Sequence, residues 1–476
     1  MTSMLRGLVL GLLLFPGAVL ALDEDDLLAW LDREQEQYAA LALALWDKAE
    51  LGYQETESSA LLQQTLAAEG FRIDSGVAGL PTAFIASYGS GEPVIALLAE
   101  FDALPGISQT AAPRPEPHPE KSSGHACGHH LFGAGATAAA VALRHWMQAN
   151  GVQGTLRVYG TPAEEGGSGK VYMVREGLFE DVDSVLVWHP SDRNAADVAT
   201  TLANKSAKFR FRGTSSHAAV APERGRSALD AVEAMNFMAN LMREHMPQET
   251  RMHYVITRGG SAPNVVPDFA ESFYYLRHPQ AATLEQLWER LLSTAAAAAL
   301  GTGTELELEV IHGNHSMLPN ETLATAVHRR LTQVGGVVYD SSDLAFAAEL
   351  ADSLAGRETD LAAAAARIEP MTVRQSMGST DVGDVSWMVP TTELRAATWV
   401  PGTAPHTWQA IAAGGTGIGT KGMMVAAKTM ALTATDLFLQ PGLLRAARSE
   451  FEQRRGPDFN YRPLLGDREP PLDYRR

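Results

Sequence analysis

Residues 155–167 read TLRVYGTPAEEGG, an apolar run that passes directly into a turn with two carboxylates. The run 155–160 is short and nearly continuous in apolar character, which predicts a strand buried on both faces of a sheet. Glu164 and Glu165 then stand at the carboxyl end of that strand, where open α/β sheets bind their ligands. The stretch therefore predicts an α/β fold with a functional site in this turn.

Two further runs of the same kind, 93–99 and 184–188, lie before and after this one along the chain. An alanine-rich segment, 130–150, separates the first two runs and is followed by a glycine, which predicts a crossover helix. Strands joined by such helices form a parallel sheet with helices on both faces. We therefore expect a central α/β sheet of this type.

The pattern changes near residue 203, where strand and helix signals follow the order β-α-β-β-α-β up to residue 313. This is the order of the ferredoxin-like α+β unit, so 203–313 is predicted to be an inserted second domain. Its first helix should begin after Ser227 and turn an apolar face through positions 229, 232, 235, 237 and 241. The remaining expected divisions are a signal peptide (1–21), a main domain in two segments (22–202 and 314–440) and a surface or disordered C-terminal tail (441–476).

Composition narrows the class of protein. The 476 residues are 45% hydrophobic and 20% charged, so the chain buries enough apolar surface to fold. The formal net charge of −18 disfavours nucleic acid and anionic lipid as partners, because both are negatively charged. The single cysteine, Cys127, excludes an intrachain disulfide. A small-molecule ligand is therefore the expected partner.

The first 21 residues have the features of an export signal. Arg6 precedes an apolar run from residue 8 to 15, a Pro-Gly break follows, and Val19 and Ala21 stand before acidic Asp23. The apolar run is shorter than the roughly 20 residues that span a bilayer. We expect cleavage after Ala21 and a periplasmic or secreted protein with no membrane segment after cleavage.

Residues 125–130 read HACGHH and stand at the start of the alanine-rich helix. A helix N-terminus favours a thiolate, so Cys127 and His129, two positions apart, are suited to bind a metal. By itself the segment is also compatible with a nucleophilic cysteine beside a histidine base, or with a buried structural segment.

Two more histidines follow predicted strands, His189 after 184–188 and His406 after the turn at 401–402. With the earlier residues they make a set of ligand types that suit Zn²⁺ or Mn²⁺: Cys127, His129, Glu165, His189 and His406. Glu164 is then left as a general base. The set predicts a two-metal hydrolase that activates water and stabilises a tetrahedral intermediate.

Four longer runs carry a resemblance to a known family: GTPAEEGGSGK at 160–170, GRSALDA at 225–231, STDVGDVSW at 379–387 and HTWQ at 406–409. On these runs and the HACGH motif, the chain resembles the di-metal aminoacylase and carboxypeptidase family. The similar branch is that of hippurate hydrolases and indole-3-acetyl-amino-acid hydrolases. The resemblance covers essentially the whole mature chain and implies a catalytic sheet with an inserted lid or dimerisation domain at 203–313.

The resemblance also implies roles for residues of the main domain. It implies that Cys127 bridges or adjoins two divalent metals, zinc or manganese, that the other four ligands share. Glu164 is implied to be the general base. Asp102 is implied to orient a ligand imidazole; from the sequence alone it is also compatible with a residue that caps a strand end.

Within the inserted domain, the resemblance implies that His217 reaches the active site of a partner subunit and stabilises the developing oxyanion. Catalysis would then require a homodimer. Asn264 and Arg277 are implied to contact the substrate, and an arginine binds a carboxylate through two parallel hydrogen bonds.

The expected activity is metal-dependent hydrolysis of the amide bond of an N-acyl amino acid. The resemblance favours substrates of the p-aminobenzoyl-glutamate type, with dipeptides, hippurate-like compounds and auxin conjugates as alternatives. A cysteine-nucleophile hydrolase using Cys127 and a non-catalytic exported binding protein are the rival classes. His130 stands where aspartate is common in the family, and the sequence leaves open whether a homologous second subunit is needed.

Overall fold

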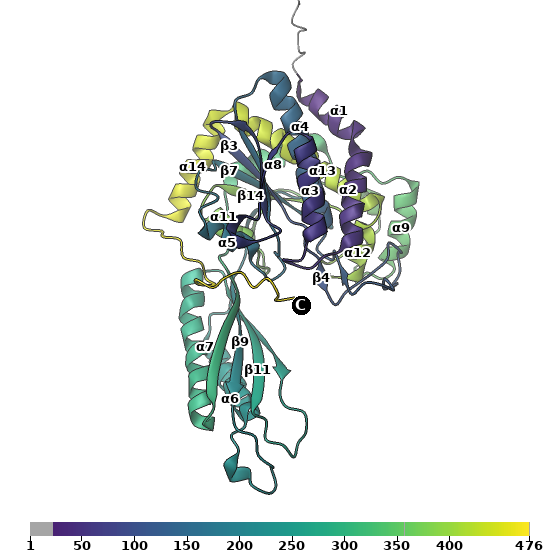
Figure 1. Ribbon diagram of the computed structural model, residues 1–476. Helices are drawn as coiled ribbons and strands as arrows, with labels where there is room; N and C mark the ends of the chain where they lie inside the picture. The colour runs from purple at the N-terminus through teal and green to yellow at the C-terminus, as the bar shows by residue number, and fades with distance from the viewer. Residues whose placement is uncertain (1–21, 357, 476) are drawn as a thin grey trace, which may run out of the picture.

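The computed structural model describes residues 22–356 and 358–475, and Figure 1 shows two parts, a broad α/β part and an elongated α+β part that projects from it. The predicted signal peptide, residues 1–21, lies outside the described residues. Among the helices that are described, none combines the length and apolar character needed to cross a bilayer.

A six-stranded sheet forms the centre of the α/β part, in the order β1-β2-β6-β3-β7-β14. Its strands are β1 (Arg72–Ser75), β2 (Phe84–Ser90), β6 (Gly154–Gly160), β3 (Val94–Ala99), β7 (Ser184–Ser191) and β14 (Thr391–Ala397). Strands β6, β3, β7 and β14 are parallel, whereas β1 and β2 pair antiparallel at one edge. Every residue of β3 and β7 is buried, which confirms the α/β sheet expected from their continuous apolar runs.

Helices α4 (His129–Asn150) and α13 (Gly417–Leu439) pack side by side on this sheet. Helix α4 occupies the predicted crossover and contacts β3, β6 and β7, and its many alanines let it lie close to them. The remaining helices of this part are α1 (Glu24–Arg33), α2 (Gln35–Lys48), α3 (Thr56–Ala68), α5 (Gly169–Arg175), α8 (Glu321–Val334), α9 (Ser341–Ala351), α10 (Leu361–Ala366), α11 (Val382–Ser386), α12 (Trp408–Gly414) and α14 (Pro441–Arg455). Two short strand pairs, β4 (Leu104–Pro105) with β5 (Ser123–Gly124) and β8 (Val198–Thr200) with β13 (Val373–Gln375), complete it.

The projecting part, called the lid below, is a four-stranded antiparallel sheet in the order β10-β11-β9-β12. It is built from β9 (Ala203–Arg212), α6 (Ala228–Met242), β10 (Arg251–Arg258), β11 (Phe269–His278), α7 (Ala281–Thr302) and β12 (Glu305–Asn314). The two helices pack on each other and on the sheet, around a hydrophobic core of their own. The chain order and the sheet order are those of the ferredoxin-like unit.

The predicted apolar face of α6 is wrong in its second half. Ser227 caps the helix by accepting a hydrogen bond from the Asp230 amide, and Met235 is buried. Phe237 and Leu241, however, are 65% and 55% exposed. A 3.6-residue period continues from position 235 to 239 and 242, where small or flexible residues are buried, so the two larger side chains lie outside that face.

The expectation of a surface or disordered tail after residue 440 is also wrong. Residues 441–455 form α14, and residues 456–475, here called the C-terminal strap, pack across both parts. Leu464 joins the lid core and Leu465 joins the core of the α/β part. Two consecutive buried leucines anchor a segment whose overall composition is polar.

Candidate metal centre and active-site cavity

A cavity of about 830 Å³ lies at the carboxyl edge of the parallel strands, where it is closed on one side by the lid. Six of the residues singled out in the sequence line it: Cys127, Glu164, Glu165, His189, Arg277 and His406. The lid adds Tyr275, next to Arg277 on β11, and the C-terminal strap adds Arg475. The position agrees with the rule that α/β sheets bind ligands at this edge.

The turn after β6 is tightly built. Ala163 has a φ of 57°, and its amide donates a hydrogen bond to the buried Glu55 carboxylate at 2.9 Å. A side chain on Gly167 would come within 2.6 Å of the Ala163 Cβ, so the return of the turn requires glycine. The Glu165 amide donates to Asp102 Oδ2 at 2.9 Å. These contacts fix two adjacent carboxylates, of which Glu165 lies 3.2 Å from His406 Nε2 while Glu164 lines the cavity.

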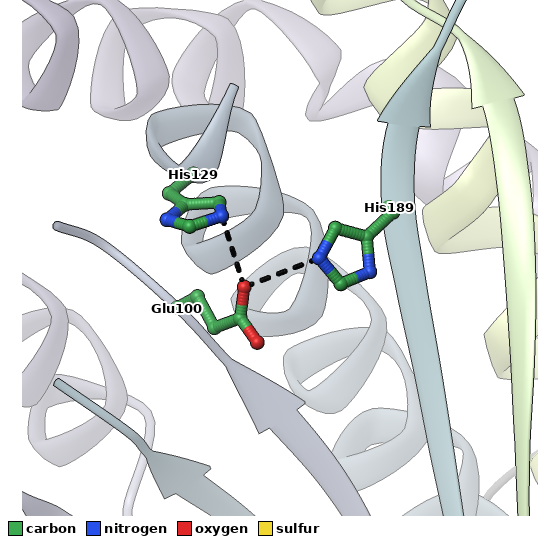
Figure 2. Close-up of side chains that lie close together, drawn as sticks. All are labelled: Glu100, His129 and His189. Carbon is green, nitrogen blue, oxygen red and sulfur yellow. Dashed lines mark ion pairs between the residues drawn. The ribbon is translucent and has the colours of Figure 1, made fainter. Parts of the chain in front are cut away.

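One group of metal-type ligands comprises Glu100, His129 and His189 (Figure 2). Glu100 directly follows β3, His129 opens α4 and His189 belongs to β7. Glu100 Oε2 lies 3.1 Å from His129 Nε2 and 3.4 Å from His189 Nε2. Three separate elements thus point their polar ends at one spot.

A second group comprises Cys127, His129 and Glu165, with ligand atoms that all lie within 4.8 Å of one another. Gly128, between the first two, has a φ of 78°, and a side chain there would meet Pro190 Cβ at 2.6 Å. His406 joins this group from the opposite side. Its φ of 62° is rare for a residue with a side chain, and its amide donates to the Ala126 carbonyl at 2.9 Å.

The two groups fit a divalent cation. Glu100 Oε2, His129 Nε2 and Glu165 Oε1 are buried and make no hydrogen bond within the described part of the chain. Asp102 Oδ1 lies 2.9 Å from His129 Nδ1, and a proton held between these two atoms leaves Nε2 free as a ligand. Thiolate, imidazole and carboxylate together suit zinc and similar metals. Asp102 therefore lies where its expected orienting role requires.

The field in the site is negative. Hydrogen bonds to Cys127 and Glu165 raise the pKa of His406 to about 11. Burial would lower the pKa of His189, but the charges of Glu100 and Glu393 raise it to about 10. The anionic side chains thus stabilise positive charge at the same points where a divalent cation would be bound.

Glu164 stands apart from both groups. Burial raises its pKa well above the usual carboxyl value, and the negative charges of Glu100 and Glu165 raise it further. A carboxylate whose affinity for a proton is increased, in a cavity beside metal-type ligands, is suited to take a proton from water.

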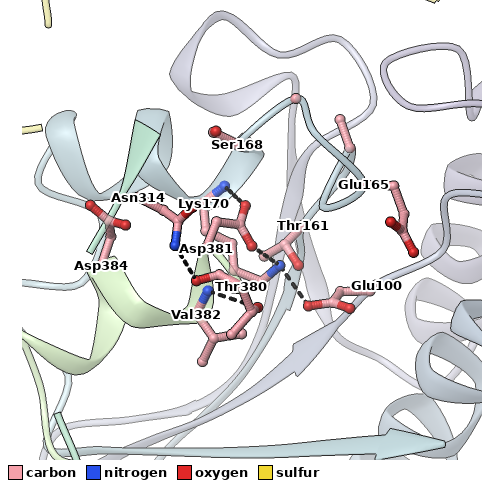
Figure 3. A network of polar contacts seen from close by, with 12 residues as sticks. Glu100, Thr161, Glu165, Ser168, Lys170, Asn314, Thr380, Asp381, Val382 and Asp384 are labelled. Carbon is pink, nitrogen blue, oxygen red and sulfur yellow. Dashed lines mark hydrogen bonds and ion pairs between the residues drawn. The ribbon is translucent and has the colours of Figure 1, made fainter. Parts of the chain in front are cut away.

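Sequence reasoning missed a buried ionic cluster behind the ligands (Figure 3). Lys170 Nζ lies 2.7 Å from Glu100 Oε1 and 2.8 Å from Asp381 Oδ1, and the Lys170 amide also donates to Asp381. All three side chains are fully buried. Glu100 had a usable signal, because it ends a buried strand just as Glu164 follows one. Lys170 had none, since a lysine is normally a surface residue.

His217 and Asn264 do not reach the cavity of their own chain. They lie together on the lid, where the Ala218 amide donates to the Asn264 carbonyl at 3.0 Å, and both are exposed. His130, the departure from the family pattern, is buried with Nε2 3.0 Å from the Gly414 carbonyl oxygen. It belongs to neither group of ligands.

A proton-accepting carboxylate beside paired groups of metal ligands is the equipment of enzymes that use metals to activate water, so fold and site together define a metal-dependent hydrolase. The chain belongs to peptidase family M20/M25/M40, whose sequence profile matches residues 96–407. The family and the hydrolase class predicted from the sequence are thereby confirmed.

Two similar proteins bring out this relationship. One of the two differently named subunits of p-aminobenzoyl-glutamate hydrolase from Escherichia coli is 40% identical over 452 residues, which cover 89% of this chain and 93% of that protein. The mouse Xaa-Arg dipeptidase is 31% identical, with 89% of this chain and 90% of the dipeptidase covered.

Solved structures show the same fold at low sequence identity. A dinuclear metal-binding M20 peptidase from Bacillus subtilis aligns with a TM-score of 0.56 and 20% identity, over 86% of this chain and 99% of its own. The aminobenzoyl-glutamate utilization protein from Klebsiella pneumoniae aligns with a TM-score of 0.61 and 18% identity, over 87% and 98%.

Proposed function

We propose that this enzyme hydrolyses the amide bond of an N-acyl amino acid that carries negative charge, with p-aminobenzoyl-glutamate as the representative substrate. One observation carries the proposal. Glu164 shares a cavity with the candidate metal ligands and with arginines that no described carboxylate neutralises. The similarity to the E. coli p-aminobenzoyl-glutamate hydrolase supports the same substrate class.

The charges of the cavity wall favour an anionic substrate over a cationic one. Arg193 and Arg277 form no ion pair with any described carboxylate, and the Nε of each is buried without a hydrogen bond. Arg395, by contrast, lies 2.6 Å from Glu393. Apart from the carboxylates at the metal centre, only Asp192 faces the cavity among the described residues without a cationic partner. This balance disfavours substrates of the Xaa-Arg type, whose side chain is a cation.

The chain's own residues divide the work of the reaction. Glu164 accepts a proton from the attacking water and returns it to the departing amide nitrogen. Arg277 binds the free carboxylate of the amino acid through its planar guanidinium and so orients the scissile bond. Two divalent ions, zinc or manganese, supply water activation and polarise the carbonyl when bound. They would be held by Cys127, His129, Glu165, His189 and His406, with Glu100 completing the first group.

The test is hydrolysis of four substrates by the purified mature protein: p-aminobenzoyl-glutamate, hippurate, indole-3-acetyl-aspartate and an Xaa-Arg dipeptide. We expect amino acid release from p-aminobenzoyl-glutamate, a fall to background after chelation, and recovery with Zn²⁺ or Mn²⁺. Metal content should be measured by mass spectrometry in the same samples. Turnover that resists complete metal removal would instead favour Cys127 as a nucleophile. A metal-loaded protein that binds but releases no product would contradict the proposed reaction.

We further propose a homodimer formed through the lid. Phe237 and Leu241 on α6 are exposed, as are Val255 and Ile256 on β10, which is an edge strand. A partner's active site would also give His217 the oxyanion role that it cannot have in its own chain. Because the E. coli relative is one of two differently named hydrolase subunits, a complex with a different chain is the alternative. Light scattering that returned the mass of one chain would contradict the homodimer.

We also propose export with cleavage after Ala21 and a periplasmic or secreted mature protein. In support, Asp23 and Asp26 form a capping box that starts α1, so a complete helix N-terminus lies immediately after the proposed cleavage point. N-terminal sequencing of protein from a periplasmic or culture fraction tests this. An intact residue 1 in the exported protein would contradict it.

A further inference from the structure

The C-terminal strap crosses the junction between the two parts of the molecule. Figure 1 shows it in yellow, passing from α14 between the α/β part and the lid to the chain end labelled C. Arg175 on α5 donates to the Arg468 carbonyl at 2.8 Å, and Arg468 in turn donates to the Val310 carbonyl on β12. The strap is therefore held by both parts on its way to the cavity.

The strap ends on the catalytic turn. Tyr474 Oη donates to the backbone carbonyl of Glu165 at 3.2 Å, and Arg475 Nη2 donates to the same oxygen. The Tyr474 ring packs edge-on against Tyr53, with centroids 5.7 Å apart. The residue that pairs with His406 is thus fixed from behind by the last residues of the chain.

Arg475 also meets the lid at the cavity wall. A side chain added to Gly166 would lie 3.5 Å from Arg475 Nη2 and 3.7 Å from Tyr275 Oη, so these two groups face the same glycine. On the other side of Tyr275, the Arg277 guanidinium lies 5.4 Å from the ring centroid. Both arginines line the cavity, and neither has an ion pair among the described residues.

We propose that Arg475 is a substrate-binding residue, which makes the C-terminal strap part of the active site and selects acyl amino acids with an acidic side chain. The inference rests on the function proposed above. Arg277 binds the carboxylate next to the scissile bond, and Arg475, across Tyr275, binds the second carboxylate at the end of the amino acid side chain. The carbonyl of Glu165 engages one of the five N–H groups of Arg475, so donors remain for a carboxylate.

The test compares p-aminobenzoyl-glutamate with p-aminobenzoyl-glutamine, which has nearly the same shape but one carboxylate fewer. The wild-type enzyme should prefer the glutamate compound. Arg475→Gln should lower kcat/KM for the glutamate compound by about 10- to 100-fold, mainly through KM, because a charged hydrogen bond is lost. The glutamine compound should change much less. Arg475→Lys, which keeps the charge, should retain part of the preference.

The matched control is Arg462→Gln, the same change at an exposed position of the same strap. It should leave the preference at the wild-type value. An equal loss on both substrates with Arg475→Gln would show a purely structural role and overturn the proposal, as would an unchanged ratio. If the wild-type enzyme cleaves neither compound, the proposed function fails; if it cleaves the glutamate compound and the ratio ignores Arg475, only this inference fails.

Discussion

We expect Glu164→Gln to lower kcat by about 10²- to 10⁴-fold, the contribution typical of a positioned general base, while the protein keeps its metal ions. Glutamine preserves the size and the hydrogen-bonding shape of the side chain but cannot accept a proton from water. Glu164 lines the cavity and belongs to neither group of clustered ligands, so its replacement should spare metal binding.

Glu165→Gln is the matched comparison, because it makes the same change one position further along the turn. Glu165 belongs to the second ligand group and lies 3.2 Å from His406, so this variant should lose metal as well as activity. The measurement is kcat together with metal content by mass spectrometry for both variants. A Glu164→Gln enzyme with activity near wild type, or one that lost its metal, would contradict the division of roles between the two carboxylates.

The catalytic edge of the sheet could be predicted from the sequence because two simple rules act together. Strands buried on both faces must be continuously apolar, so 93–99, 155–160 and 184–188 stand out in the chain. Function in such sheets gathers where those strands end, so the polar residues that follow are candidates. Glu164, Glu165 and His189 were found in this way, and Glu100 would have been found by applying the rule to the first run.

Contacts between distant segments could not be predicted in this way. Lys170 and Asp381 are 211 positions apart, and nothing in the neighbourhood of either shows that the other will neutralise it. The C-terminal strap failed for a related reason. Its polar composition indicates solvent exposure, whereas two leucines and a few carbonyl groups decide where it lies, by contacts with both parts.

Lys170→Met should destabilise the protein by about 3–5 kcal/mol, the range for removing one partner of a buried ionic cluster. Burial would lower the pKa of Lys170, but the charges of Asp381 and Glu100 raise it, so the lysine is charged in the folded protein. Methionine has a similar length and no charge. The substitution therefore leaves two carboxylates without a counterion in a site that water does not reach.

Urea denaturation of the metal-free protein measures the effect as a change in the free energy of unfolding. Lys428→Met provides the control, because Lys428 pairs with a partner, Asp32, whose side chain is 58% exposed, and such pairs contribute only about 0–1 kcal/mol. A second substitution, Asp381→Asn, added to Lys170→Met should recover part of the loss by removing one uncompensated charge. If Lys170→Met costs no more than the control, the cluster does not stabilise the fold. If instead the loss is large and Asp381→Asn restores none of it, missing methylene packing rather than unpaired charge is the cause, because only the electrostatic explanation links the two positions.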